Sequence, residues 1–260
     1  MISDMRVFET GDAILMDLEG AVAATVRDRL SQFIFSEDVE VRDLTASTMQ
    51  LGVYGPHAAA IVSSTLGVDL TTAPAVVTLP APLSYVVKSD DVGVSGFDVI
   101  VPAERRDALA QALHDAGAVD VDEETTETTR IEAARPRFGV DMDEDTIPLE
   151  AGIEDRAISL TKGCYVGQEI IIRVLHRGGG RVARRLVQLL FGAGAPVPER
   201  GAAVFSGDRQ IGSVTSATHS PAAGAAIALA YVHRDFAAGS TAVTVTGHPA
   251  SVAAAPLVIA

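Results

Sequence analysis

Apolar residues along the chain recur with two spacings, which together predict a mixture of helices and strands. Residues 22–35 carry an apolar side chain at every third or fourth position, which is typical of one face of a helix. Residues 39–44 and 49–55 alternate between apolar and polar side chains, which is typical of strands. Further helices are predicted at residues 57–66 and 104–116, and further strands at residues 75–79, 83–88 and 97–101.

Turn-forming residues separate these elements. A Gly-Asp pair at residues 11–12 stands between two short apolar runs and predicts a β-hairpin. Gly67 and Gly117 follow the predicted helices at the position where glycine commonly ends a helix. Because hairpins and crossing helices are mixed with neighbouring strands, the pattern predicts an α+β fold rather than a parallel doubly wound sheet.

The part of the chain from residue 182 to residue 260 is strand-like throughout. Glycine, proline and Asp-Arg turns separate its short apolar runs. Strands are predicted at residues 186–191, 202–205, 210–216, 227–232 and 241–245. Short strands with this spacing are typical of a small antiparallel barrel or sandwich.

The charge balance narrows the classes of partner. The chain has 34 acidic and 20 basic residues among 260, which gives a formal net charge of −14. Such an acidic surface repels polyanions, so we expect neither stable non-specific nucleic-acid binding nor binding to a membrane. A single cysteine fits a reducing compartment, and no secretory signal is visible. We therefore expect a cytoplasmic protein.

Residues 162–169 read Lys-Gly-Cys-Tyr-Val-Gly-Gln-Glu and hold the only cysteine, Cys164. Two glycines flank it and an apolar run follows, so we expect a tight turn that feeds a helix or strand at about residue 166. Backbone N–H groups at a helix start and the ammonium of Lys162 would then favour a reactive or ligating thiolate. A lone cysteine can also be a small core residue. A core position, however, needs none of these polar neighbours.

Two further groups of polar residues, the histidines and a run of arginines, are candidates for binding a metal or an anion. The six histidines form no pair at ligand spacing, so we predict no metal site. Arginine is concentrated between residues 173 and 185, which suits either a solubilising linker or an anion-binding segment. These arginines stand at positions 173, 177, 181, 184 and 185.

The octapeptide at residues 162–169, with Arg173 and then Arg177-Gly178 downstream, resembles the signature of the folate-binding YgfZ family. That family is related to the glycine-cleavage T-protein, aminomethyltransferase. Upstream, Arg130-Ile-Glu, an aromatic-Gly pair at Phe138 and Pro148-Leu-Glu resemble the motifs that line the folate site of these relatives.

The resemblance implies a ligand and roles for individual residues. Tetrahydrofolate would be the ligand, and Cys164, assisted by Lys162, would be the reactive group. A guanidinium can clasp a carboxylate, and a carboxylate can accept two hydrogen bonds from the edge of a pterin. The implied folate-binding residues are Arg130, Glu132, Phe138, Glu150, Gln168, Glu169 and Arg173. Bare surface charges are the alternative for Arg130 and Glu132.

The resemblance also implies an architecture. It is a T-protein-like multi-domain fold with a ferredoxin-like α+β body and a C-terminal antiparallel β-barrel. We expect the body at residues 1–117, a segment with the folate and cysteine motifs at residues 118–181, and the barrel at residues 182–260. Family members usually begin with an additional segment, so we expect the first domain to be shortened relative to the family.

Two departures from aminomethyltransferases shape the functional expectation. Those enzymes carry Gly-Glu-Asp-Gly where residues 93–96 here read Gly-Val-Ser-Gly, and Val94 cannot accept pterin hydrogen bonds. Typical T-proteins also lack the cysteine motif. The resemblance therefore implies a folate-binding protein that assists assembly or repair of iron-sulfur enzymes, including tRNA-modifying ones. Its partners would be iron-sulfur proteins or their assembly machinery.

Two other functions remain open. One is folate-dependent one-carbon transfer, as an aminomethyltransferase or demethylase. The other is a non-catalytic interaction protein that docks a partner through Cys164.

Overall fold

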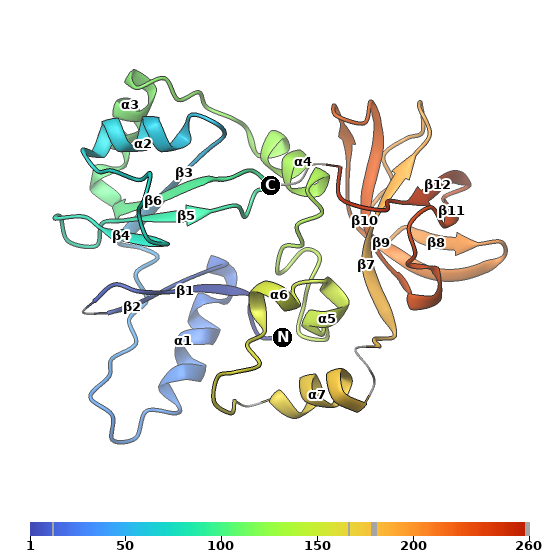
Figure 1. Ribbon diagram of the computed structural model, residues 1–260, viewed down its shortest axis with the longest axis horizontal. Coiled ribbons are helices and arrows are strands. Elements are labelled where there is room, and N and C mark those ends of the chain that lie inside the picture. Colours follow the sequence, from blue (N-terminus) through green and yellow to red (C-terminus); the bar gives the residue numbers. More distant parts are fainter. Residues whose placement is uncertain (12, 166, 178–180, 258–260) are drawn as a thin grey trace. The chain divides into compact units, whose positions relative to one another are not determined.

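A computed structural model describes residues 1–11, 13–165, 167–177 and 181–257 (Figure 1). The chain divides into two compact units: the N-terminal unit is Ile2–Thr126, and the C-terminal unit runs from Glu127 onwards and includes Met1. Within the described ranges, no helix is both long enough and apolar enough to cross a bilayer. Each unit is described by itself below.

The N-terminal unit begins with the predicted hairpin, which the structure confirms. Strands β1 (Met5–Glu9) and β2 (Ile14–Leu18) pair antiparallel, with Met5 opposite Leu18. Gly11 adopts a positive φ of 99° in the turn, a conformation that glycine adopts without strain. Asp12, the other predicted turn residue, lies outside the described residues. A short 3₁₀ turn (Gly20–Val22) and helix α1 (Ala23–Ser31) follow.

A four-stranded antiparallel sheet in the order β3-β6-β5-β4 forms the centre of this unit. Its strands are β3 (Thr48–Tyr54), β4 (Val76–Thr78), β5 (Tyr85–Ser89) and β6 (Gly96–Pro102). Helices α2 (Ala58–Leu66) and α3 (Arg106–Asp115) lie on one side of the sheet in Figure 1, and a 3₁₀ turn (Ala103–Arg105) precedes α3. Buried Val62, Val99 and Leu113 belong to one core cluster and join both helices to the sheet. Gly67 ends α2 with a positive φ, as predicted.

The strand predicted at residues 39–44 is wrong. Its alternating pattern is real, but no strand of the described chain pairs with it, and Val39 is 60% exposed. Local turns use the backbone there instead: Asp43 accepts a hydrogen bond from the N–H of Thr45, and the carbonyl of Leu44 accepts one from the N–H of Ser47. Alternation alone does not make a strand, because the backbone groups of a strand need a partner.

The C-terminal unit starts in helix α4 (Glu123–Glu132), which carries the chain from one unit into the other. Three short helices follow: α5 (Pro148–Ala151), α6 (Glu154–Ala157) and α7 (Gln168–Ile172). Pro148 occupies the first turn of α5, where its missing N–H costs nothing. A π-helical turn (Arg173–Arg177) extends α7.

The predicted barrel is confirmed: antiparallel strands close in the order β10-β7-β12-β11-β8-β9. They are β7 (Arg184–Phe191), β8 (Ala203–Ser206), β9 (Arg209–Ser220), β10 (Ala225–His233), β11 (Ala242–Val245) and β12 (His248–Val252), with a 3₁₀ turn at Arg234–Phe236. Leu189, Val204 and Val245 are fully buried in its core. The sequence pattern missed β12, which pairs with both β11 and β7 and completes the barrel. Mixed α/β architecture with a C-terminal barrel is therefore correct.

Candidate functional site

Arg130 lies near the C-terminal end of α4, and its guanidinium is the centre of a buried polar network. Its side chain is 4% exposed. It donates to Asp141 Oδ2 at 2.7 Å and to Ser216 Oγ of β9 at 3.0 Å. It also donates to Glu127 Oε2 at 2.8 Å and to the carbonyl of Arg135. Together with the contacts of Nε to Glu127, these bonds engage every N–H group of the guanidinium.

Asp141 is the principal counter-charge of Arg130 and is fully buried. Its Oδ1 accepts hydrogen bonds from the hydroxyls of Thr215 at 2.5 Å and Ser216 at 2.6 Å. Burial disfavours the charged guanidinium, but the hydrogen bonds and charges of Glu127 and Asp141 outweigh it, so the pKa of Arg130 is raised. The network holds α4 and the Asp141 segment against β9. A ligand carboxylate could reach Arg130 only by displacing one of these partners.

Glu132 follows Arg130 on α4 and is 8% exposed. Its Oε1 accepts a hydrogen bond from Ser220 Oγ at 2.5 Å and one from the N–H of Ala222 at 3.3 Å. Among the described residues, Oε2 makes no hydrogen bond. Gln188 of β7 donates to the carbonyls of Ile131 and Glu132 at the end of the helix, where carbonyl groups lack the partners of a continuing helix; the Ile131 carbonyl also accepts from the N–H of Ala134.

Glu150, on α5, is 7% exposed and pairs with Arg184 of β7 at 2.9 Å. The guanidinium of Arg184 lies 4.5 Å from the ring centroid of Tyr231. Burial opposes the charge on Arg184, but the hydrogen bond and charge of Glu150 raise its pKa. Burial raises the pKa of Tyr231 to about 12. In the part of the chain that the structure describes, Glu150 Oε1 has no hydrogen bond, and the buried Tyr231 hydroxyl has none either.

The cysteine segment differs from these buried groups because it lies on the surface. Cys164 is exposed, and so are Lys162 and Glu169. The ammonium of Lys162 lies 4.2 Å from the ring centroid of Tyr165. Gln168 Oε1 accepts a hydrogen bond from the N–H of Tyr165 at 3.0 Å and so forms the predicted turn, which leads into α7 at Gln168. Val166 and Gly178 of the motif lie outside the described residues.

The predicted site residues fall into groups rather than one cluster. Arg130 and Glu132 both meet β9, at Ser216 and Ser220. Glu150 lies beside Arg184 and Tyr231, and Tyr231 pairs with Ser213 in the barrel. Ser213 and Ser220 are seven positions apart on β9, so Glu132 lies farther along this strand than the Tyr231 group does.

The remaining predicted residues belong to two other surroundings. Phe138 is half-buried and packs against the core cluster of Met142, Ala151 and Ile153. Arg173 pairs with Glu169 at 2.6 Å on the surface. Helices α5 and α7 are joined through a core cluster that contains Leu149, Ile171 and Val182. The helix that follows the cysteine is therefore anchored against α5, which carries Glu150, while no described contact joins the cysteine segment to Arg130 or Glu132.

The N-terminal unit contains a second charge cluster, which is partly buried around the buried Asp98 and was not predicted from the sequence. Arg6 of β1 lies opposite Asp17 of β2 and pairs with it, with Asp98 of β6 at 2.6 Å and with Asp91 at 3.1 Å. Tyr54 donates to Asp98 at 2.5 Å. Burial opposes the charge of Arg6, but these carboxylates raise its pKa; burial and Asp98 raise the pKa of Tyr54. The cluster joins the hairpin to the sheet. The cross-strand Arg6–Asp17 pair was its only signal in the sequence.

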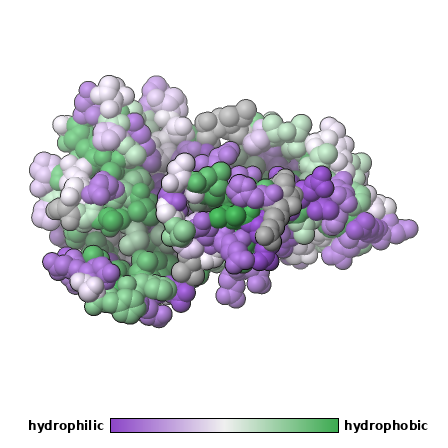
Figure 2. All heavy atoms as spheres, turned by 60° about the horizontal axis from the view of Figure 1, so that its bottom comes forward, coloured by the Kyte–Doolittle hydropathy of each residue, from purple (hydrophilic) through white to green (hydrophobic). Residues whose placement is uncertain are grey.

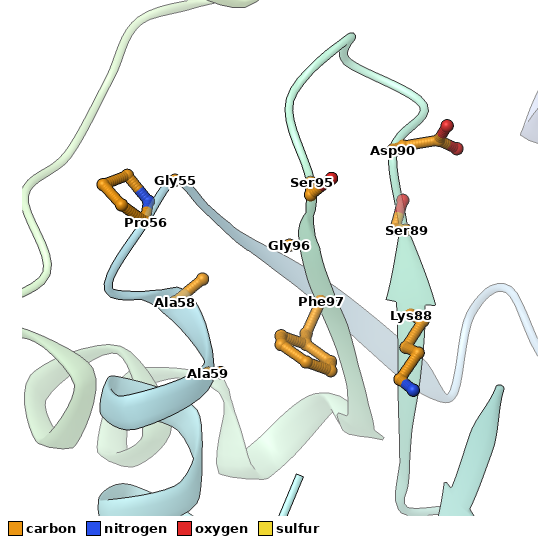
Figure 3. Close-up of a pocket in the computed structure, with 10 residues that line it drawn as sticks. All are labelled: Gly55, Pro56, Ala58, Ala59, Lys88, Ser89, Asp90, Ser95, Gly96 and Phe97. Carbon is orange, nitrogen blue, oxygen red and sulfur yellow. The ribbon is translucent and has the colours of Figure 1, made fainter. Parts of the chain in front are cut away.

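A surface pocket of about 550 Å³ lies beside this cluster, at the N-terminal end of α2 and the ends of β5 and β6 (Figure 3). Figure 3 shows the Phe97 ring between α2 and the strand that carries Lys88. Lys88 Nζ donates to the carbonyl of Ala73 at 2.5 Å. Ser89 and Asp90 contribute polar groups at the rim. An apolar floor with few polar groups is the usual composition of a small-molecule pocket.

Comparison with known protein families shows which family this chain belongs to. Residues 1–162 match the GCVT N-terminal domain, and residues 184–258 match the glycine cleavage T-protein C-terminal barrel domain. The chain belongs to the glycine cleavage T-protein family. The predicted relationship to the glycine-cleavage T-protein is thus confirmed. Assignment to the YgfZ branch would be a finer division of the same superfamily.

Similar proteins of the T-protein family include aminomethyltransferases from several bacteria. One from Thermosynechococcus vestitus is 36% identical over 204 residues, which cover 76% of this chain and 54% of the relative. One from Streptomyces coelicolor is 31% identical over 251 residues, covering 93% of this chain and 67% of the relative. The chain thus spans about half to two thirds of their length.

A solved structure agrees with the fold. The crystal structure of glycine cleavage system aminomethyltransferase T from Bartonella henselae superimposes with a TM-score of 0.83. The superposition covers 98% of this chain and 72% of the other, at 22% sequence identity. Identity at this level supports the shared fold alone.

Proposed function

We propose that this member of the T-protein family is a tetrahydrofolate-binding protein of the YgfZ type. Its exposed cysteine segment assists the assembly or repair of iron-sulfur enzymes, including tRNA-modifying ones. The observation that carries the proposal is the position of Cys164. The thiol is exposed on the turn before α7, a helix whose Ile171 packs with Leu149 of α5, and the chain has no other cysteine.

Two carboxylates favour folate as the ligand. Glu132 and Glu150 are almost fully buried, yet each keeps one oxygen without a hydrogen-bond partner among the described residues. A carboxylate oxygen that remains accessible and unbonded can accept hydrogen bonds from a ligand, and the amino-pyrimidine edge of a pterin offers N–H donors. The donors of Arg130 are already engaged by other residues of the protein. Arg130 would therefore hold α4 in place and so position Glu132, rather than bind folate itself.

The cysteine segment favours an accessory role over complete one-carbon transfer. An exposed thiol with a lysine two residues away can exchange with or ligate a partner's metal centre only if a partner can reach it, and Cys164 meets that condition. Val94 stands where the resemblance implies the pterin-binding glutamate of aminomethyltransferases. Without this glutamate the pterin lacks one hydrogen-bond acceptor, which disfavours catalysis of aminomethyl transfer.

The test has two independent arms. Addition of tetrahydrofolate to the purified chain should raise its melting temperature, and Glu132→Gln together with Glu150→Gln should abolish the shift. In a host that depends on this protein, Cys164→Ala should lower iron-sulfur enzyme activity, while Ser36→Ala, at an exposed position of the N-terminal unit, should not. No thermal shift at saturating folate would refute the folate arm, and full activity with Cys164→Ala would refute the thiol arm.

The second candidate is folate-dependent aminomethyl transfer, which is favoured by the names of the relatives. Turnover of an aminomethyl or methylamine donor by the purified chain with tetrahydrofolate would support this candidate. Introduction of a pterin acceptor by Val94→Glu should then increase turnover. The accessory role predicts no turnover by the unaltered chain or by Val94→Glu.

A further inference from the structure

We propose that the surface around α7 is a docking surface for an acidic protein partner that presents apolar side chains. This inference deepens the proposed function, since it names the chemistry of the partner that reaches Cys164. The docking surface is defined by Leu160, Lys162, Tyr165, Ile170 and Ile172.

The apolar part of the docking surface is larger than its position on a short helix requires. One isoleucine is enough to anchor α7: Ile171 is 8% exposed and packs with Leu149 and Val182. Its neighbours Ile170 and Ile172 are 58% and 38% exposed. Leu160 is 72% exposed and Tyr165 is 37% exposed. Side chains of this kind contribute binding energy when a partner covers them, and contribute little to folding when they are exposed.

Local contacts hold Lys162 and Tyr165 at the start of α7. Tyr165 is fixed on the turn by the hydrogen bond to Gln168 and lies under the ammonium of Lys162. The N–H of Ile170 bonds to the carbonyl of Gly167, so the turn continues directly into α7. The face that carries α7 is at the bottom of Figure 1 and comes forward in Figure 2, where apolar green side chains lie beside hydrophilic purple ones.

The charge of the segment selects the partner. Residues 156–185 contain seven basic side chains and one acidic one, a net charge of +6, whereas the other residues contain 13 basic and 33 acidic ones, a net charge of −20. Arg181 is exposed and precedes Val182, which packs against Ile171. The basic segment therefore attracts an acidic partner, while the rest of the surface repels one elsewhere.

A protein suits this surface better than RNA does. An RNA site places basic groups along the backbone path and aromatic rings against the bases. Here three of the five residues that define the docking surface are aliphatic, namely Leu160, Ile170 and Ile172, and the surface has one aromatic ring, Tyr165, which Lys162 already covers. Exposed aliphatic side chains beside a charged one are typical of a protein interface.

The test uses fluorescently labelled synthetic peptides and the intact purified chain. The first is an amphipathic helical peptide of glutamate and leucine; one control replaces glutamate by lysine, and another replaces leucine by serine. Fluorescence anisotropy should show the first peptide binding about tenfold more tightly than either control. A single-stranded RNA oligonucleotide serves as the fourth probe, and tighter binding of RNA than of the acidic peptide would overturn the proposal.

Variants locate the binding. Ile170→Ser and Lys162→Glu should each weaken the acidic peptide by about tenfold, because one removes an apolar contact and the other reverses a charge. Val119→Ser, at an 85% exposed apolar position of the N-terminal unit, is the matched control and should leave binding unchanged. Equal effects of Val119→Ser and Ile170→Ser, or equal binding of all peptides, would overturn the proposal. If the unaltered chain does not bind the acidic peptide but still shows the folate shift, this inference is refuted while folate binding stands.

Discussion

Arg130 and Arg173 both belong to the C-terminal unit and both pair with a glutamate about one helical turn earlier, yet their surroundings are opposite. Arg130 is 4% exposed, and Asp141 and Ser216 engage it from other parts of the chain in addition to Glu127. Arg173 is 63% exposed and meets only Glu169 among the described residues. A glutamate three or four residues before an arginine thus belongs to a buried network in one region and forms a surface pair in the other.

The comparison separates two roles within the predicted site. The residues around Arg130 are fixed by partners distant in the sequence, so they hold the barrel and α4 together. The residues around Cys164 keep their polar and apolar groups available to other molecules. The four predictions below test this separation, and all stability measurements refer to urea unfolding of the C-terminal unit followed by circular dichroism.

The largest expected effect is the loss of Arg130. Arg130→Ala leaves Asp141 buried without its counter-charge and should lower the free energy of unfolding by about 3–5 kcal/mol. Arg173→Ala removes only an exposed pair and should cost less than about 1 kcal/mol. Similar costs for the two variants would show that burial does not distinguish the two regions.

The next effect concerns alkaline pH. Burial raises the pKa of Tyr231 to about 12, above the value near 10 of an unfolded tyrosine. Between these values the unfolded chain releases a proton that the folded chain retains, so stability is complete below about pH 10 and falls as pH rises toward 12. The loss should reach about 2–3 kcal/mol. Tyr231→Phe should remove this part of the pH dependence, and an unchanged slope in that variant would contradict the assignment.

A smaller effect is expected at the end of α4. Ser220→Ala removes the hydroxyl that donates to the buried Glu132 and should cost about 1–3 kcal/mol. Ser206→Ala, at a half-buried position of β8 with no side-chain hydrogen bond among the described residues, is the matched control and should be nearly neutral. If Ser220→Ala is as mild as the control, Glu132 does not depend on β9.

The smallest effect is expected at the cysteine. Cys164→Ser should change the free energy of unfolding by no more than about 0.5 kcal/mol, since the side chain is exposed. A maleimide probe should label native Cys164 without prior unfolding, whereas a buried thiol would react only after urea is added. If the native thiol does not react with maleimide, Cys164 is buried, as Arg130 is.

Several features of the fold were readable from the chain because they depend on neighbouring residues. Gly11 allows the turn of the first hairpin, Gly67 ends α2, and the turn before α7 was visible in the glycines around Cys164. The strand-rich composition of the C-terminal part predicted the barrel. Each of these signals is local, and local backbone preference decides the result.

Tertiary structure decided the remainder, because it brings together residues that are far apart in the sequence. Alternation at residues 39–44 found no partner strand, whereas β12 became a strand by pairing with β7 and β11. Arg130 meets Ser216 across 86 positions, and Arg6 meets Asp98 across 92. The sequence marked Arg130, Glu132 and Cys164 as candidates through their residue types and order. Only folding decided which of their charges are neutralised inside the protein and which remain exposed, since burial depends on the whole surroundings of a side chain.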